Sequence, residues 1–247
     1  MSSTYRWNQA EFAAGYDAAG VYIHPHYREL QEAILDLLPL ASNAHVLLVD
    51  AGGGSGRLAA LFLEKFPQSR AIVVDQSEPF LALARERLNA FGGRGTTLLA
   101  RLQDDWPRQL PEPPAAIVSM SAIHHLSPEE KQNLYGRMHS ALAPGGVLMN
   151  GDEIRQKSDA DYLASMNTWS AHMQAMQDAG KIPGEMQEIL DYWRDKNIAR
   201  RGAPKKSGDD CHETIAAQID YLRTAGFSTV DAPWQREMWA ILRGVKV

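Results

Sequence analysis

The chain has 247 residues, of which 45% are hydrophobic, so it is long enough to bury one sizeable core. Its formal net charge of -5 argues against a protein that binds duplex nucleic acid through a basic face. A single cysteine excludes an internal disulfide, and no apolar run approaches the roughly 20 residues that a membrane-spanning helix needs. We therefore expect one soluble, cytoplasmic domain over residues 1–247.

The first part of the chain alternates helical and strand-like patterns. Residues 1–40 are expected to form an N-terminal helical segment, because Leu30, Ile34 and Leu37 share one helical face. Five short apolar runs follow, and each is typical of a strand buried on both faces. These runs are residues 45–50, 71–75, 96–102, 115–120 and 146–152. Helical patterns separate them, with N-cap serines expected at Ser77 and Ser127. This order predicts a parallel sheet with helices on both faces.

The last part of the chain departs from that order. Residues 153–211 contain no strand pattern, and we expect a helical lid inserted after the fifth strand. An apolar stripe at helical spacing favours a packed lid core over a ligand-binding box. The stripe comprises Tyr162, Met166, Trp169, Met173 and Met176. Two further runs, 227–232 and 236–244, are joined by a short turn that contains Pro233. Because that link is too short for a parallel crossover, the last strand is expected to be antiparallel to its neighbour.

A glycine-rich loop lies between the first strand and the helix that follows it. The sequence Asp50-Ala-Gly-Gly-Gly-Ser-Gly56 allows positive φ angles and close approach of a ligand to the backbone. The helix N-terminus behind the loop favours an anionic group. The dinucleotide fingerprint needs a glycine at its sixth position, where this chain has Arg57. The loop therefore differs from the one that binds nicotinamide cofactors.

The strand, the acid and the G-x-G-x-G spacing together resemble the class I S-adenosylmethionine-dependent methyltransferases, in particular their small-molecule subgroup. The resemblance is specific over residues 45–152, which also hold a "PGG" turn before the fifth strand. It implies a Rossmann-like sheet of seven strands in the order 3-2-1-4-5-7-6. It also implies that Asp50, Gly52 and Gly54 hold the methionine moiety of S-adenosylmethionine, with S-adenosylhomocysteine as the product.

The resemblance extends to further cofactor residues. Asp75 ends the second strand, where an acid of the family accepts hydrogen bonds from the ribose hydroxyls, and Gln76 would lie near the adenine. Asp104 follows the third strand, where it is either an adenine contact or part of a solvated turn. Ser121 follows the fourth strand and is assigned to the cofactor site. Tyr16 either closes over the cofactor or packs in the core.

The acceptor chemistry is expected beyond the carboxyl ends of the strands, where His124, His125 and Glu153 follow the fourth and fifth strands. A histidine can orient an acceptor or take a proton from an oxygen nucleophile near neutral pH. We expect no metal site, because Asp209, Asp210, Cys211 and His212 are adjacent and do not easily face one ion. An N-cap cluster explains that segment, and His24 is expected in packing or at the surface.

The resemblance therefore implies methyl transfer, and we expect the acceptor to be an oxygen or nitrogen atom of a small molecule. That molecule would have an apolar or aromatic part if the lid stripe faces it. The alternatives are a nicotinamide-dependent oxidoreductase and a non-catalytic protein that binds S-adenosylmethionine. A nucleic-acid acceptor is not expected, because SMSAIHH (119–125) lacks the acid-or-Asn-Pro-Pro-aromatic motif of DNA amino-methyltransferases. Composition assigns no oligomeric state.

Overall fold

The computed structural model describes residues 6–247 and forms a seven-stranded sheet in the order β3-β2-β1-β4-β5-β7-β6. The strands are β1 (Leu47–Ala51), β2 (Arg70–Asp75), β3 (Gly95–Leu99), β4 (Ala116–Met120), β5 (Val147–Glu153), β6 (Thr229–Arg236) and β7 (Trp239–Val245). Strands β1 to β5 are parallel, and β7 is antiparallel to both β5 and β6. The predicted strand order and the antiparallel last strand are confirmed.

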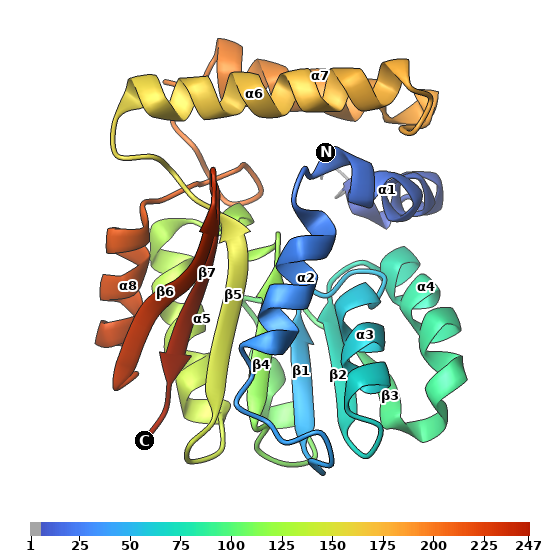
Figure 1. Ribbon diagram of the computed structural model, residues 1–247, viewed down its shortest axis with the longest axis vertical. Coiled ribbons are helices and arrows are strands. Elements are labelled where there is room, and N and C mark those ends of the chain that lie inside the picture. Colours follow the sequence, from blue (N-terminus) through green and yellow to red (C-terminus); the bar gives the residue numbers. More distant parts are fainter. Residues whose placement is uncertain (1–5) are drawn as a thin grey trace.

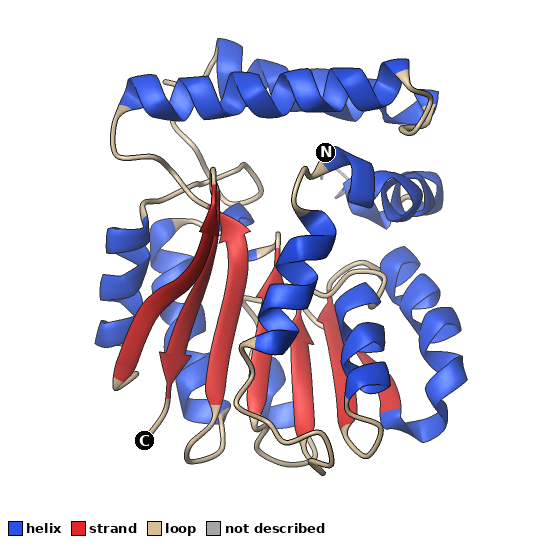
Figure 2. Cartoon of the chain, in the orientation of Figure 1, coloured by secondary structure: helices blue, strands red, loops and turns tan. Residues whose placement is uncertain are grey.

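Helices cover both faces of this sheet, as Figures 1 and 2 show. One face is covered by α2 (Tyr27–Asp36), α3 (Arg57–Lys65) and α4 (Glu78–Leu88), and the other by α5 (Pro128–Ala141) and α8 (Ile215–Thr224). Because side chains alternate along a strand, Leu48 packs in the core of the first face while Leu47 and Val49 pack in the core of the second. The continuous apolar runs reflect this burial on both faces.

Several local signals lead to the expected structures. The Ser77 hydroxyl accepts a hydrogen bond from the Phe80 N–H at the start of α4. Ser127 and Glu130 form the predicted capping box at the start of α5.

The expected turn at Pro233 is wrong, since Pro233 lies inside β6, where the pairing with β7 shifts register between Asp231 and Trp234. Strand β6 is the edge strand, and an irregular edge tolerates a residue without an N–H.

The lid lies above the carboxyl ends of the parallel strands (Figure 1). It contains α6 (Asp159–Asp178) and α7 (Gln187–Arg194), and α1 (Ala10–Ile23) lies between the lid and the sheet. The remaining short helical segments are 3₁₀ turns at 6–8, 89–94, 106–109, 123–125 and 184–186, and a π turn at 195–199. Trp169 of α6 is buried and donates a hydrogen bond from Nε1 to the Ile23 carbonyl (2.7 Å). Among the described residues, no helix is both long and apolar enough to cross a membrane.

Candidate active site

The glycine loop forms a backbone cradle at the carboxyl end of β1. Gly52 and Gly54 have φ angles of 72° and 52°, in the region that favours glycine. A Cβ on Gly52 would lie 2.6 Å from the Ala122 Cβ, so the loop packs closely against the segment after β4. Gly53 was not singled out from the sequence, yet a Cβ there would lie 2.5 Å from the Asp50 Cγ. The positive φ angles favour glycine at positions 52 and 54, and the close approach of the Asp50 side chain favours glycine at position 53. The unbroken glycine run was the sequence signal for the middle one.

Two carboxylates flank this loop. Asp50 is buried, and its Oδ2 atom has no hydrogen-bond partner within residues 6–247. Burial raises the pKa of Asp50 to about 7. Asp75 accepts hydrogen bonds from the backbone N–H groups of Gly54 (3.0 Å) and Ser77 (2.8 Å), and burial raises its pKa as well. The two acids lie at the ends of adjacent strands, as the sequence predicted.

A cavity of about 890 Å³ lies over this loop. Its lining includes most of the predicted cofactor residues, namely Tyr16, Asp50, Gly52, Gly54, Asp75, Gln76 and Ser121. Asp104 does not join them, because its side chain is exposed and accepts a hydrogen bond from the Arg101 N–H (3.0 Å) within its own turn. The glycine cradle and the unpartnered oxygen of Asp50 fit a ligand that carries a cationic group, such as the ammonium of S-adenosylmethionine.

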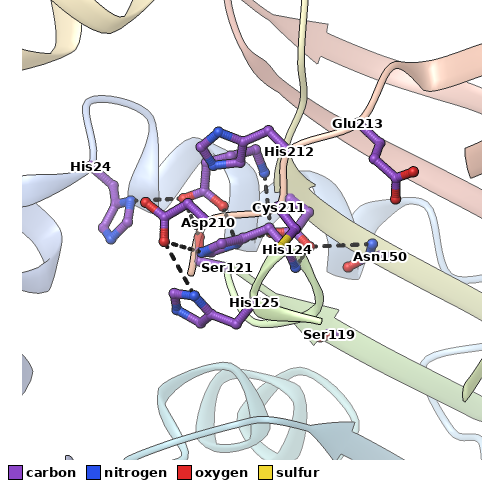
Figure 3. A network of polar contacts seen from close by, with 12 residues as sticks. His24, Ser119, Ser121, His124, His125, Asn150, Asp210, Cys211, His212 and Glu213 are labelled. Atoms are coloured by element: carbon purple, nitrogen blue, oxygen red, sulfur yellow. Dashed lines mark hydrogen bonds and ion pairs between the residues drawn. The ribbon is translucent and has the colours of Figure 1, made fainter. Parts of the chain in front are cut away.

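A cluster of imidazoles and carboxylates follows β4 and β5 (Figure 3). His124 is buried, and its Nδ1 lies 2.6 Å from Asp152 Oδ1 and 2.8 Å from Glu153 Oε2. Burial alone would lower the pKa of His124, but Glu153 and Asp152 together raise it well above its usual range. Ser121 donates a hydrogen bond to Glu153 Oε1 (3.1 Å). His124 is therefore held rigidly by the two acids that end β5.

The chain returning from the lid brings a third acid to this cluster. Asp210 Oδ1 lies 3.2 Å from His125 Nδ1 and 3.7 Å from His124 Nε2, and Figure 3 shows Asp210 between His125 and His212. The sequence interpretation of Asp210 as part of an N-cap is wrong, because Thr214 caps α8 and accepts from the Ala217 N–H. His212 shares a hydrogen bond with the Tyr162 hydroxyl (2.7 Å), and burial lowers its pKa to about 3.

His24 also joins the cluster, contrary to its expected place in packing or at the surface. It is buried, its Nδ1 lies 3.2 Å from Glu153 Oε1, and its Nε2 shares a hydrogen bond with the Tyr16 hydroxyl (2.8 Å). The segment between α1 and α2 supplies this histidine, far from β5 in the sequence. No local pattern around the His24-Pro-His26 sequence signalled this contact.

Comparison with known proteins identifies the family. A family model described as a methyltransferase domain matches residues 49–148. Trans-aconitate 2-methyltransferase of Acidovorax sp. (strain JS42) is 35% identical over 127 residues, which cover 49% of this chain and 45% of that protein. The chain contains a methyltransferase domain over residues 49–148, and its sheet has the strand order expected for the class I S-adenosylmethionine-dependent methyltransferases. S-adenosylmethionine is the cofactor of this family, and the cradle described above fits it.

Two further proteins are similar to the methyltransferase, one in sequence over about half of the chain and one in fold over most of it. Ribosomal RNA small subunit methyltransferase C of Pseudomonas aeruginosa (strain UCBPP-PA14) is 32% identical over 132 residues, which cover 52% of this chain and 38% of that protein. Human N-acetylserotonin methyltransferase, solved in complex with S-adenosylmethionine, has a TM-score of 0.59 at 16% identity, covering 95% of this chain and 58% of that one. The methyltransferase spans about half the length of the curated relatives that it matches.

A second pocket of the methyltransferase, of about 120 Å³, lies between the lid and the imidazole cluster. Its apolar lining comes mainly from the lid, through Trp169, Met173, Leu190 and Trp193. Its polar lining includes Ser121 and the cluster residues His24, His124, His125, Glu153 and Asp210, together with Lys196, Asn197 and Asp209. Trp169 and Met173 belong to the predicted stripe, so this stripe both packs the lid and faces a pocket.

Arg57 is the residue that distinguishes the loop from a dinucleotide fingerprint, and it links α1 of the methyltransferase to the start of α3 through an ion pair. Its Nε lies 2.9 Å from Asp17 Oδ1, and Arg87 of α4 pairs with the other oxygen of Asp17 at 2.9 Å. Ser55 donates a hydrogen bond to the same carboxylate. Burial would raise the pKa of Asp17, but Ser55 and the two guanidinium groups lower it. The helix that carries Tyr16 is thereby held over the cofactor cavity.

Proposed function

We propose that this methyltransferase transfers the methyl group of S-adenosylmethionine to an oxygen or nitrogen atom of a small acceptor bound beneath the lid. The observation that carries the proposal is the junction of the two cavities. Tyr16, Ser121 and His125 line both the large cavity and the small pocket. Methyl transfer requires the sulfur, the methyl carbon and the nucleophile to be in line, and adjoining sites supply that alignment by positioning.

The cofactor residues each have a role in this proposal. Asp50 binds the ammonium group of the methionine moiety, since its Oδ2 atom is buried and unpartnered among the described residues. Asp75 binds the ribose hydroxyls, because each of its oxygens accepts one backbone hydrogen bond and retains a further lone pair. Gln76 lines the same cavity beside Asp75 and contacts the adenine. Tyr16 covers the cofactor from α1.

The acceptor pocket combines aromatic walls with a polar floor, which suits an acceptor that has one apolar part and one polar, nucleophilic end. Ser121, His125 and Glu153 orient the nucleophile at the junction. His124 acts as a positioning residue, because Asp152 and Glu153 hold its Nδ1. An oxygen nucleophile also gives up a proton, and this floor supplies the proton acceptors within reach.

Titration calorimetry with S-adenosylhomocysteine tests the cofactor site. Wild type should bind, and Asp75→Ala should weaken binding by roughly 10-fold or more, because two charge-assisted hydrogen bonds are lost. Asp104→Ala is the matched control, since Asp104 is exposed and lies in its own turn; its affinity should equal that of wild type. Failure of wild type to bind would refute the proposal, and unchanged affinity of Asp75→Ala would refute the ribose assignment.

Transfer is tested with S-adenosylmethionine carrying an isotopically labelled methyl group. The acceptor panel contains phenols, amines, trans-aconitate, transfer RNA and ribosomal RNA, and labelled products are identified by mass spectrometry. Label in a small molecule supports the proposal. Label only in RNA overturns the assignment of the acceptor class, and cofactor binding without any transfer favours a non-catalytic binding protein.

A further inference from the structure

We propose that His124, His125 and Asp210 form a binding site for a divalent first-row transition metal on the floor of the acceptor pocket. One ligand atom from each residue lies within 4.8 Å of the others. Two imidazoles and one carboxylate are a donor set that such metals favour, and the set leaves coordination positions open. The site goes beyond the proposed function, because metal binding is measured without methyl transfer.

The distances within the site suit a metal after a small shift of side chains. The Asp210 Oδ1 atom lies 3.2 Å from His125 Nδ1 and 3.7 Å from His124 Nε2. Two donors that are each about 2.1 Å from one ion lie about 3.0 to 3.4 Å apart, for octahedral and tetrahedral arrangements respectively. The separation of 3.2 Å lies within this range, and the separation of 3.7 Å exceeds its upper end by about 0.3 Å, which a small side-chain movement would close.

The contact between His125 and Asp210 is an ion pair without a well-formed hydrogen bond. The Nδ1 atom of His125 is buried and makes no hydrogen bond of acceptable geometry, although Asp210 lies close to it. The neighbouring His212 also has a buried Nε2 atom without a partner, and its ring centroid lies 5.4 Å from that of His124. Buried polar atoms without partners are costly unless a ligand or a water completes them. A metal ion bound between His125 and Asp210 would give this nitrogen a full partner.

The outer contacts are those that a metal site needs. His124 faces Asp152 with Nδ1 at 2.6 Å, which leaves Nε2 free to bind a metal. Asp210 Oδ2 accepts a hydrogen bond from Asn197 Nδ2 (2.6 Å), which leaves Oδ1 directed at the two histidines. Metal-binding imidazoles usually donate their other N–H to a carboxylate, and metal-binding carboxylates are themselves hydrogen-bonded. Both conditions are met here.

The backbone fixes the two segments that supply these residues. The N–H groups of Gly208 and Cys211 donate to the carbonyl oxygens of His125 and His124, each at 2.8 Å. Lys131 is fully buried and donates to the Cys211 carbonyl. The sequence argument against a metal concerned adjacent residues of the 209–212 segment. The structure instead combines one acid of that segment with two histidines from the turn after β4.

The local charge also favours a cation. Asp152, Glu153 and Asp210 converge on this floor, and in the described part of the chain all of their ion-pair partners are histidines. Buried carboxylates need a compensating positive charge. A divalent ion compensates them without depending on protonated imidazoles. The other His–carboxylate trio, His124 with Asp152 and Glu153, has separations of 2.6 and 2.8 Å, which are hydrogen-bond lengths and indicate a shared proton.

Metal binding by the full chain, prepared without a polyhistidine tag and stripped with chelator, tests the site directly. Zn²⁺ is titrated by calorimetry, and Co²⁺ is followed by its visible absorption. Wild type should bind a single ion per chain. His125→Ala and Asp210→Asn should each weaken the affinity by more than about 100-fold, because losing even an outer contact of a metal site costs roughly 10- to 100-fold. His125 is half-exposed, so its replacement should leave the fold intact.

His45→Ala is the matched control, because His45 is exposed and precedes β1, at the opposite end of the strand from the site. Its affinity should equal that of wild type. Circular dichroism must show that each variant is folded. The proposal is overturned if wild type does not bind either ion, or if folded His125→Ala binds as tightly as wild type. Because S-adenosylhomocysteine is titrated separately, failure here is distinguishable from failure of the cofactor site.

Discussion

The pKa of Asp50 makes cofactor affinity depend on pH. In the ligand-free protein this carboxyl is buried, and its pKa is raised to about 7. If the ionised carboxylate binds the ammonium group of S-adenosylhomocysteine, a ligand arriving at pH 6 must first displace a proton from Asp50. Affinity should therefore fall as the pH decreases through 7, whereas an ordinary aspartate would show no change above about pH 5.

The magnitude follows from the fraction of Asp50 that is ionised. With a pKa of about 7, roughly nine-tenths of the protein carries the carboxylate at pH 8 and about one-tenth at pH 6. The dissociation constant should therefore rise about 10-fold between pH 8 and pH 6, which corresponds to about 1.4 kcal/mol. At pH 5 the loss should approach about 90-fold.

Calorimetric titration of S-adenosylhomocysteine at pH 5, 6, 7 and 8 measures this profile. Asp50→Asn should bind weakly with a nearly flat profile, since its amide does not titrate. 5′-Methylthioadenosine retains the nucleoside but lacks the ammonium group, so its affinity should also be nearly independent of pH. A flat profile for wild type, or equal slopes for the two ligands, would refute the assignment of Asp50 to the ammonium group.

Three further predictions concern stability. Asp50→Asn should stabilise the ligand-free protein at pH 8 by up to about 4 kcal/mol, and this gain should vanish near pH 4. The reason is that the pKa of Asp50 rises from 3.8 in the unfolded chain to about 7 in the folded protein, so ionisation between these pH values destabilises the fold. Urea unfolding of both proteins at pH 4 and pH 8 measures the difference in the free energy of unfolding. Gly52→Ala should lower the free energy of unfolding by about 1–3 kcal/mol, because position 52 has a positive φ and the new Cβ would clash with Ala122. Adding Ala122→Gly should remove the clash but not the backbone strain, and so restore only part of the loss. Full stability of the single variant would contradict this geometry. Ser127→Ala should cost about 1 kcal/mol in thermal unfolding, whereas Ser127→Asp, which keeps a capping oxygen, should cost much less.

The positions of the residues that we assign to the cofactor were predictable because their sequence signals are local. Gly52, Gly54 and Asp75 lie where a strand meets a loop or a helix, and the sequence shows both the strand and the glycines. Parallel strands place their carboxyl ends at one edge of the sheet, so Asp50 and Asp75 follow from topology alone. The alignment of the segment after β3 with the family's acid position was less certain. Asp104 was assigned to the cofactor from that alignment, but it lies in an exposed turn and does not line the cavity.

The acceptor half was only partly predictable, because its residues come together through long connections. His124 lies in the turn after β4 and Glu153 ends the adjacent strand β5, so both were expected at this edge of the sheet. Asp210 reaches them only after the chain has passed through the whole lid, and His24 approaches from the segment before β1. Neither contact leaves a periodic pattern in the sequence. Pro233 shows a similar limit, since its place inside β6 depends on that strand being at the edge.

The ionic connection between α1 and the core affects how the methyl donor exchanges. One turn of α1 carries both Tyr16, which lines the large cavity, and Asp17, which forms ion pairs with Arg57 of α3 and Arg87 of α4. Uncovering the donor by moving this turn would therefore break two ion pairs at once. Donor binding, product release and the attachment of α1 should therefore all depend on Asp17, and because its ion pairs are partly buried, salt should weaken them only slightly.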